Sequence, residues 1–134
     1  MQFPKGTTFA VADGRKLRLF RNTGDALQLE LKELAPPVLE PHDAGSGSRH
    51  RNSAANPDDQ LSEEDGHAAA TAAYLNRQVL VGEIHNLFVV APPRTLGELR
   101  RHYHASLKLK LIGELDKEHT GDTPEKLLKA LVAA

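Results

Sequence analysis

Hydrophobic and polar residues alternate through the first quarter of the chain. In TTFAVADGRKLRLFRN, residues 7–22, apolar side chains alternate on both sides of an Asp13-Gly14 pair. Asp-Gly supports the positive φ angles of a tight two-residue turn, so this stretch predicts a β-hairpin. Residues 26–34 alternate in the same way and predict a third, half-buried antiparallel strand, with one face formed by Leu27, Leu29 and Leu31.

The alternation stops at residue 35. Residues 35–59 are rich in Pro, Gly, Ser, Asn and His and show no hydrophobic period. They predict a long irregular loop inside a single domain that spans residues 1–134. A loop of this length in a compact domain is usually either functional or a flexible insertion, and both interpretations remain open.

Helical spacing begins after the loop. Apolar residues recur at intervals of three, four and seven, which predicts an amphipathic helix on Leu61, Ala68, Ala72, Leu75 and Val79. The short apolar run Leu87–Ala91, ended by two prolines, predicts a buried central strand. We then expect Thr95 to cap a helix that reaches about Ala105.

The remaining chain predicts one strand and one helix. Residues 107–117 alternate strictly, which favours a strand, although Leu107, Leu111 and Leu115 also fit one face of a helix. Thr123 followed by Pro124 is a typical helix start. The resulting order is βββ-α-β-α-β-α. It predicts an α/β fold with a mixed five-stranded sheet, in the layout of ribonuclease-H-like domains.

Composition adds few constraints. The 134 residues carry a net charge of -1 and no cysteine, so disulfides and thiol chemistry are excluded and no overall field demands nucleic acid. The start of the chain lacks the apolar core of a signal peptide, and no apolar run approaches the roughly 20 residues of a membrane span. We therefore expect a cytoplasmic protein.

Charge is nevertheless unevenly distributed. Residues 58–65 contain five acids and no base, whereas residues 94–110 contain five basic residues against Glu98 alone. This asymmetry predicts one acidic and one basic surface.

Three stretches resemble the bacterial host-attachment protein family, whose members are described as required for attachment to host cells. They are VADGRKLRLFRN, LFVVAPPRTLGELRRHYH and GELDKEHTGDTPEKLLKAL, and together they extend over nearly the whole chain. The family is similar in turn to the middle domain of archaeal and eukaryotic peptide-chain release factors. The resemblance implies the same α/β layout.

A release-factor middle domain carries a Gly-Gly-Gln loop before its first long helix, and this loop helps water to cleave peptidyl-tRNA. His50-Arg51-Asn52 would occupy that position here. Both glycines are absent, and with them the close backbone approach to a substrate. We do not transfer the activity. A hydrolase acting on an RNA-linked ester or a phosphodiester through residues 44–57 is the alternative function.

Other catalytic arrangements lack their residues. A two-metal nuclease would need a carboxylate after Leu87–Ala91, where prolines stand instead, and Asp13 is more simply a turn residue. His102 and His104 are two positions apart, so on a helix they face different directions. No phosphate loop or nucleophile elbow is present. We expect no metal and no cofactor.

The basic residues are the remaining candidates. Arg94 follows a strand and precedes a helix, where open α/β sheets often bind ligands. We predict an RNA or anion surface formed by Arg94, Arg100, Arg101, Lys108, Arg49 and Arg51. Partial neutralisation of Arg94 and Arg101 by Glu98 is also expected, and a merely solvated helix face is the simpler interpretation. The sequence thus favours a non-catalytic module that binds RNA, the ribosome or a protein partner. A purely structural role, with self-association through Leu/Ala helix faces, is also open.

Overall fold

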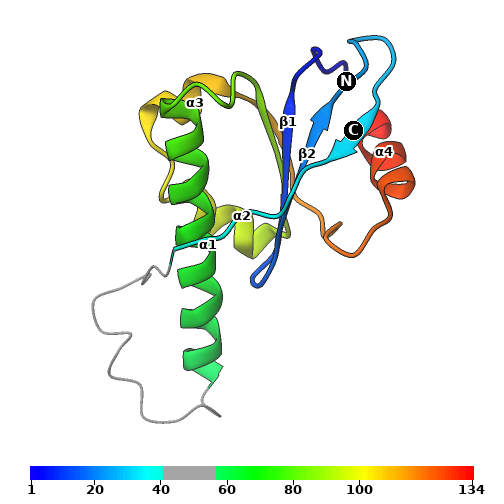
Figure 1. Cartoon of the computed structure of the whole chain (residues 1–134). Helices are drawn as coiled ribbons and strands as arrows, with labels where there is room; N and C mark the ends of the chain where they lie inside the picture. The colour runs from blue at the N-terminus through cyan, green and yellow to red at the C-terminus, as the bar shows by residue number, and fades with distance from the viewer. Residues whose placement is uncertain (41–56) are drawn as a thin grey trace.

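The computed structural model describes residues 1–40 and 57–134. Figure 1 shows one sheet with a long helix on one side and a short helix on the other. In chain order the elements are β1 (Thr8–Ala12), β2 (Leu17–Asn22), β3 (Leu31–Glu33), α1 (Pro57–Leu80), β4 (Leu87–Val90), α2 (Pro93–Arg100), α3 (Ala105–Lys110), β5 (Leu111–Leu115) and α4 (Pro124–Ala133).

The sheet has five strands in the order β3-β2-β1-β4-β5. The β1–β2 and β2–β3 pairs are antiparallel, and the β1–β4 and β4–β5 pairs are parallel. The predicted mixed five-stranded sheet is therefore confirmed. Because β1 and β4 are central and covered on both faces, every one of their residues is buried.

The alternation of side chains along β1 divides the core into two clusters. Ala10 and Ala12 face α1, α2 and α3, together with Leu75, Leu96 and Leu107. Phe9 and Val11 face the other side, where α4 covers a cluster completed by Phe3, Phe20, Phe88, Leu127 and Leu131. Among the helices of residues 1–40 and 57–134, α1, α2 and α3 thus share one face of the sheet, and α4 packs on the other (Figure 1).

The third strand is shorter than predicted. Only Leu31–Glu33 pair with β2, and Leu27 is 82% exposed. The cause is a turn centred on Asp25, whose Oδ1 accepts hydrogen bonds from the main-chain amides of Leu27 and Gln28. These side-chain hydrogen bonds compete with strand pairing, as is typical of Asx turns.

The second helical segment also differs from its prediction. Thr95 does not cap α2, which begins at Pro93 without a side-chain cap and ends at Arg100. The alternating segment 107–117, for which the sequence favours a strand over a helix, is divided: residues 105–110 form α3, and the strand begins only at Leu111. Leu107 is fully buried whereas Leu109 is 85% exposed, a pattern that a helix turn produces and a strand with one buried face does not.

The other boundaries agree more closely. Thr123 accepts a hydrogen bond from the Lys126 main-chain amide and Pro124 opens α4, as the sequence predicts. Residues 35–40 contain no helix or strand, but the predicted loop does not reach Asp59, because α1 already begins at Pro57.

Candidate nucleic-acid interface

The connection between α2 and α3 is fixed to α1 by one buried side chain. Asn76 is 3% exposed. Its amide nitrogen donates to the His102 carbonyl at 2.9 Å, and its side-chain oxygen accepts from the His104 amide at 3.0 Å. Asn76 of α1 therefore forms hydrogen bonds with the main-chain groups on both sides of Tyr103. The connection lies beside the C-terminal half of α1 (Figure 1, yellow).

A hollow of about 350 Å³ lies between these elements. We call it the alanine hollow, and its lining consists of Ala69, Ala73, Asn76, Arg77, Leu80, His102 and His104. The alanines expose no polar groups, and the Asn76 amide is already bonded to the main chain. The hollow therefore has an apolar floor, with a guanidinium and two imidazoles at its rim.

Further basic residues lie on α3 and on the connection before it, both of which contact α1. The α1–α3 face, as we name it, consists of Arg77, Arg101, His102, His104 and Lys108. Arg101 bonds Glu98 at 3.0 Å, yet its side chain is 71% exposed and that of Glu98 only 11%. Glu98 also contacts the His102 ring at 3.3 Å. Three permanent cations thus stand against two carboxylates, the largely buried Glu98 and Glu40, which lines a hollow together with Arg77. This face therefore keeps a small positive balance.

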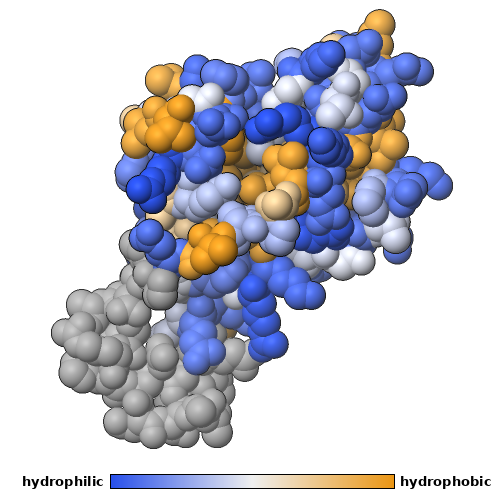
Figure 2. Space-filling model, in the orientation of Figure 1, coloured by the Kyte–Doolittle hydropathy of each residue, from blue (hydrophilic) through white to orange (hydrophobic). Residues whose placement is uncertain are grey.

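The same end of the molecule exposes apolar side chains. Leu80 and Val81, at the end of α1, are 66% and 61% exposed. Figure 2 shows apolar atoms at this end beside strongly hydrophilic ones. Exposed apolar side chains and basic groups thus occur at the same end of the molecule.

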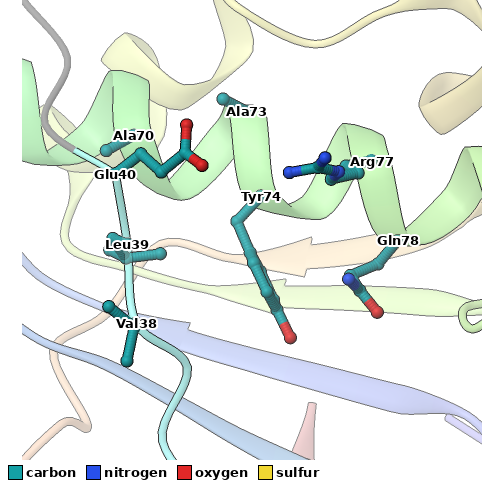
Figure 3. A pocket seen from close by; sticks show the side chains of 8 residues that line it. All are labelled: Val38, Leu39, Glu40, Ala70, Ala73, Tyr74, Arg77 and Gln78. Atoms are coloured by element: carbon teal, nitrogen blue, oxygen red, sulfur yellow. The ribbon is translucent and has the colours of Figure 1, made fainter.

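A second hollow, of about 390 Å³, lies on the other side of the Ala73–Arg77 row. It is formed where residues 38–40 cross α1, and Tyr74 makes one wall (Figure 3). The Glu40 carboxylate and the Arg77 guanidinium point toward one another across it (Figure 3). No ion pair joins Arg77 to any acid of the described residues, so its charge is exposed to both hollows.

Arg94 and Arg100 have different surroundings. Arg94 bonds Asp65 of α1 at 3.0 Å, not Glu98, and Arg100 bonds Glu114 of β5 at 2.7 Å. A hollow at the carboxyl ends of β4 and β5 is lined by Pro93, Leu96, Arg100, Glu114 and Asp116. Of the predicted basic residues that the structure describes, only Arg100 lines it, and two carboxylates accompany it. This edge has no positive balance of its own.

The buried Tyr103 hydroxyl lies beside the Glu114 carboxylate. Burial raises the pKa of Tyr103, and the neighbouring Glu114 raises it further. The ring is 8% exposed and its hydroxyl forms no hydrogen bond of good geometry. Tyr103 therefore stays neutral and anchors the α2–α3 connection in the core.

Asp13 is a structural residue of the β1–β2 turn, as the sequence predicts. The predicted two-residue turn with positive φ angles is wrong, because the turn comprises residues 13–16 and neither Asp13 nor Gly14 has a positive φ. Its Oδ1 accepts from the Arg15 and Lys16 amides, and its Oδ2 accepts from the Thr120 hydroxyl at 2.6 Å. Burial opposes ionisation of Asp13, but these hydrogen bonds outweigh it and lower the pKa. Thr120 also contacts Glu118. Asp13 thereby ties the hairpin to the loop before α4.

Arg18 also connects the β1–β2 hairpin to the loop before α4. It forms two hydrogen bonds with Glu33, at 2.8 and 2.9 Å. The same guanidinium donates to the carbonyls of Thr120 and Asp122. Among residues 1–40 and 57–134, no group of three or more His, Asp or Glu side chains is arranged to hold a metal ion.

Several predicted residues lie outside the described part of the chain. Arg49 and Arg51 lie outside it, as does the His50-Arg51-Asn52 segment that the alternative hydrolase would use. These remain predictions from the sequence. Over the described residues, no helix is both long enough and apolar enough for a bilayer crossing.

Sequence reasoning missed the two α1 residues that organise the face. Arg77 lies 17 positions before Arg94, outside the basic segment 94–110, so the charge pattern of the sequence does not include it. Asn76 carries no signal in a single sequence, since a polar residue on a helix is ordinarily solvent-exposed. The buried apolar positions on either side of it, Leu75 and Val79, were the available clue.

Fold and surface together define a small α/β domain with a basic, partly apolar face on its helical side. The model of bacterial archaeo-eukaryotic release factor family 12 matches residues 6–131, nearly the whole chain. The chain belongs to this family, which confirms the predicted relation to release factors. No curated protein matches the chain. The predicted attachment role is not addressed by this match and stays a prediction.

Proposed function

We propose that this chain is a non-catalytic RNA-binding module that contacts the sugar-phosphate backbone of cytoplasmic RNA, in the ribosome or in tRNA, through the α1–α3 face. The observation that carries the proposal is the arrangement of Arg77, Arg101 and Lys108. All three side chains are exposed, whereas Glu98, the acid that pairs with Arg101, is largely buried. Membership of a release-factor family supports an RNA partner.

The physical argument is electrostatic. Each lysine or arginine that neutralises a phosphate releases a condensed counterion, so affinity depends steeply on salt. Arg101 uses one guanidinium nitrogen for Glu98 and keeps its other donors available. A net charge of -1 over the whole chain does not oppose this, because RNA responds to the local surface potential.

Arg94 and Arg100 remain part of the proposal as a second set at the carboxyl edge of the sheet. Each is bonded to a carboxylate, so we assign them a smaller contribution. Attachment to a host, where it occurs, would then be an indirect consequence of RNA binding.

The test is the affinity for a fluorescein-labelled mixed-sequence RNA oligonucleotide, measured by anisotropy at several salt concentrations. Arg77→Ala/Lys108→Ala should weaken binding by about tenfold or more at low salt, and reduce the salt slope by about 1 per lost contact. The matched control Lys126→Ala/Lys129→Ala removes the same charge from α4, on the opposite face, and should bind normally. Arg94→Ala/Arg100→Ala should show an intermediate loss.

Glu40→Gln provides a test in the opposite direction. This carboxylate faces Arg77, so its removal should strengthen RNA binding. Equal affinities of Arg77→Ala/Lys108→Ala and of its control Lys126→Ala/Lys129→Ala would refute the α1–α3 face. Absence of binding at low salt would refute an RNA-binding function.

A further inference from the structure

The alanine hollow has a chemistry that phosphate binding alone does not use. Its floor is made of Ala69, Ala73 and Leu80, and no acid lines it. Exposed cations such as Lys108 are sufficient for binding phosphates. A recess with an apolar floor instead fits a flat, weakly polar group that leaves water when it enters.

The rim restricts what that group is attached to. Arg77, His102 and His104 stand around the opening, and the described residues include no carboxylate in the lining. A guanidinium binds phosphate through its edge and stacks on nucleobases through its face. The rim therefore fits a ligand that combines a planar base with an adjacent phosphate.

The alanine hollow is also preformed, because fixed residues make its walls. Ala69 is 1% exposed and packs into the core, and Asn76 fixes the opposite wall through the main chain of His102 and His104. Binding therefore requires little ordering of the protein, which lowers the cost of association.

We propose that the alanine hollow holds one unpaired nucleobase of single-stranded RNA, with the neighbouring phosphate at Arg77 and His104. This inference rests on the RNA-binding function proposed above and makes it specific for single strands. A paired base is stacked inside its duplex and must be extruded before it can enter, at a cost of a few kcal/mol. Duplex RNA would contact only the cations of the face.

The test compares two probes of equal length and charge: a labelled single-stranded RNA of mixed sequence and the same strand with abasic sites at every position. Intact RNA should bind about tenfold more tightly than abasic RNA, because a base that enters the hollow covers its apolar floor and leaves water. The corresponding duplex should bind like the abasic strand.

Ala73→Leu identifies where the base lies. Ala73 is an exposed helix residue, and leucine is nearly as good a helix former, so the fold should persist. Its larger side chain fills the floor and should abolish the preference for intact RNA while leaving abasic RNA bound. Gln78→Leu, which adds apolar bulk beside the other hollow only, is the matched control and should retain the preference.

The outcomes separate the two proposals. Equal binding of intact and abasic RNA overturns the base site and leaves phosphate binding standing. A preference for intact RNA that survives Ala73→Leu also overturns it, since the bases then bind elsewhere. Failure of both probes to bind at low salt refutes RNA binding itself.

Discussion

The side-chain amide of Asn76 donates a hydrogen bond to the carbonyl oxygen of His102 over 2.9 Å, although the two residues are 26 positions apart. Because the same side chain accepts from the His104 amide, the helix and the irregular connection behave as one rigid unit. The basic residues of the α1–α3 face depend on this unit for their relative positions.

Replacement of Asn76 by alanine should therefore both destabilise the protein and weaken RNA binding. Two main-chain groups at a partly buried site lose their partner, at a cost of about 1–3 kcal/mol. The free energy of unfolding in urea measures the first effect. Gln78→Ala, on the same helix but half-buried and without a hydrogen bond to the connection, should change stability by about 0.5 kcal/mol or less. Equal losses in both variants would contradict the role of Asn76.

Stability should decrease as the solution becomes acidic. Burial of His67 lowers its pKa below the ordinary 6.5, so just below pH 6.5 the unfolded chain binds a proton that the folded chain does not. Stability is therefore fully present above about pH 6.5 and is lost as pH falls toward the folded pKa of His67. Asp13, whose pKa is also lowered, adds a second loss below its ordinary 3.8.

Urea midpoints recorded between pH 8 and pH 5 measure the His67 effect, and the Asp13 loss lies below that range. His67→Gln should give a flatter profile than the wild type in this window, because glutamine does not titrate. Identical profiles for the two proteins would mean that His67 is not the group responsible.

Gly113→Ala should destabilise the sheet. A Cβ at this position in β5 would lie 2.8 Å from the Phe88 ring, which packs edge-on against Phe3. The ring has no free space to move into, so we expect a loss of about 1–3 kcal/mol, as for other overpacked cores. Thermal or urea unfolding of the purified variant measures this loss.

Gly97→Ala is the matched comparison for that substitution. No atom outside its own helix lies within 4 Å of the added Cβ, and alanine is the better helix former. This variant should gain about 0.5–1 kcal/mol. A loss of stability in Gly97→Ala would contradict the open space described around Gly97. A neutral effect of Gly113→Ala would contradict the close packing described around Gly113.

The sequence predicted the sheet because its strands carry strong local signals. The Asp13-Gly14 turn and the buried run of β4 are each visible within a few residues, and the parallel order follows from the α/β succession. The short β3 and the start of β5 were not predictable in this way. The Asp25 side chain accepts hydrogen bonds from nearby main-chain amides, and this turn prevents strand pairing before Leu31. The spacing of Leu107, Leu111 and Leu115 fits both a helix and a strand, so the sequence did not locate the start of β5.

The candidate interface was only partly predictable for a similar reason. Arg101 and Lys108 belong to a basic segment that composition reveals. Arg77 joins them only through the packing of α1 against α3, a contact between distant parts of the chain. The ion pairs of Arg94 with Asp65 and of Arg100 with Glu114 are equally non-local, and they could not be read from spacing.

The parallel pairing of β1 with β4 has a consequence for the speed of folding. Thr8 pairs with Leu87, so the centre of the sheet cannot form until distant parts of the chain have met. The β1–β2 hairpin is local and can form early, but the entropy of closing so long a loop must be spent before the central pair contributes any stabilisation. This domain should accordingly fold more slowly than a helical bundle of the same length, with both faces of its core completed in the same late step.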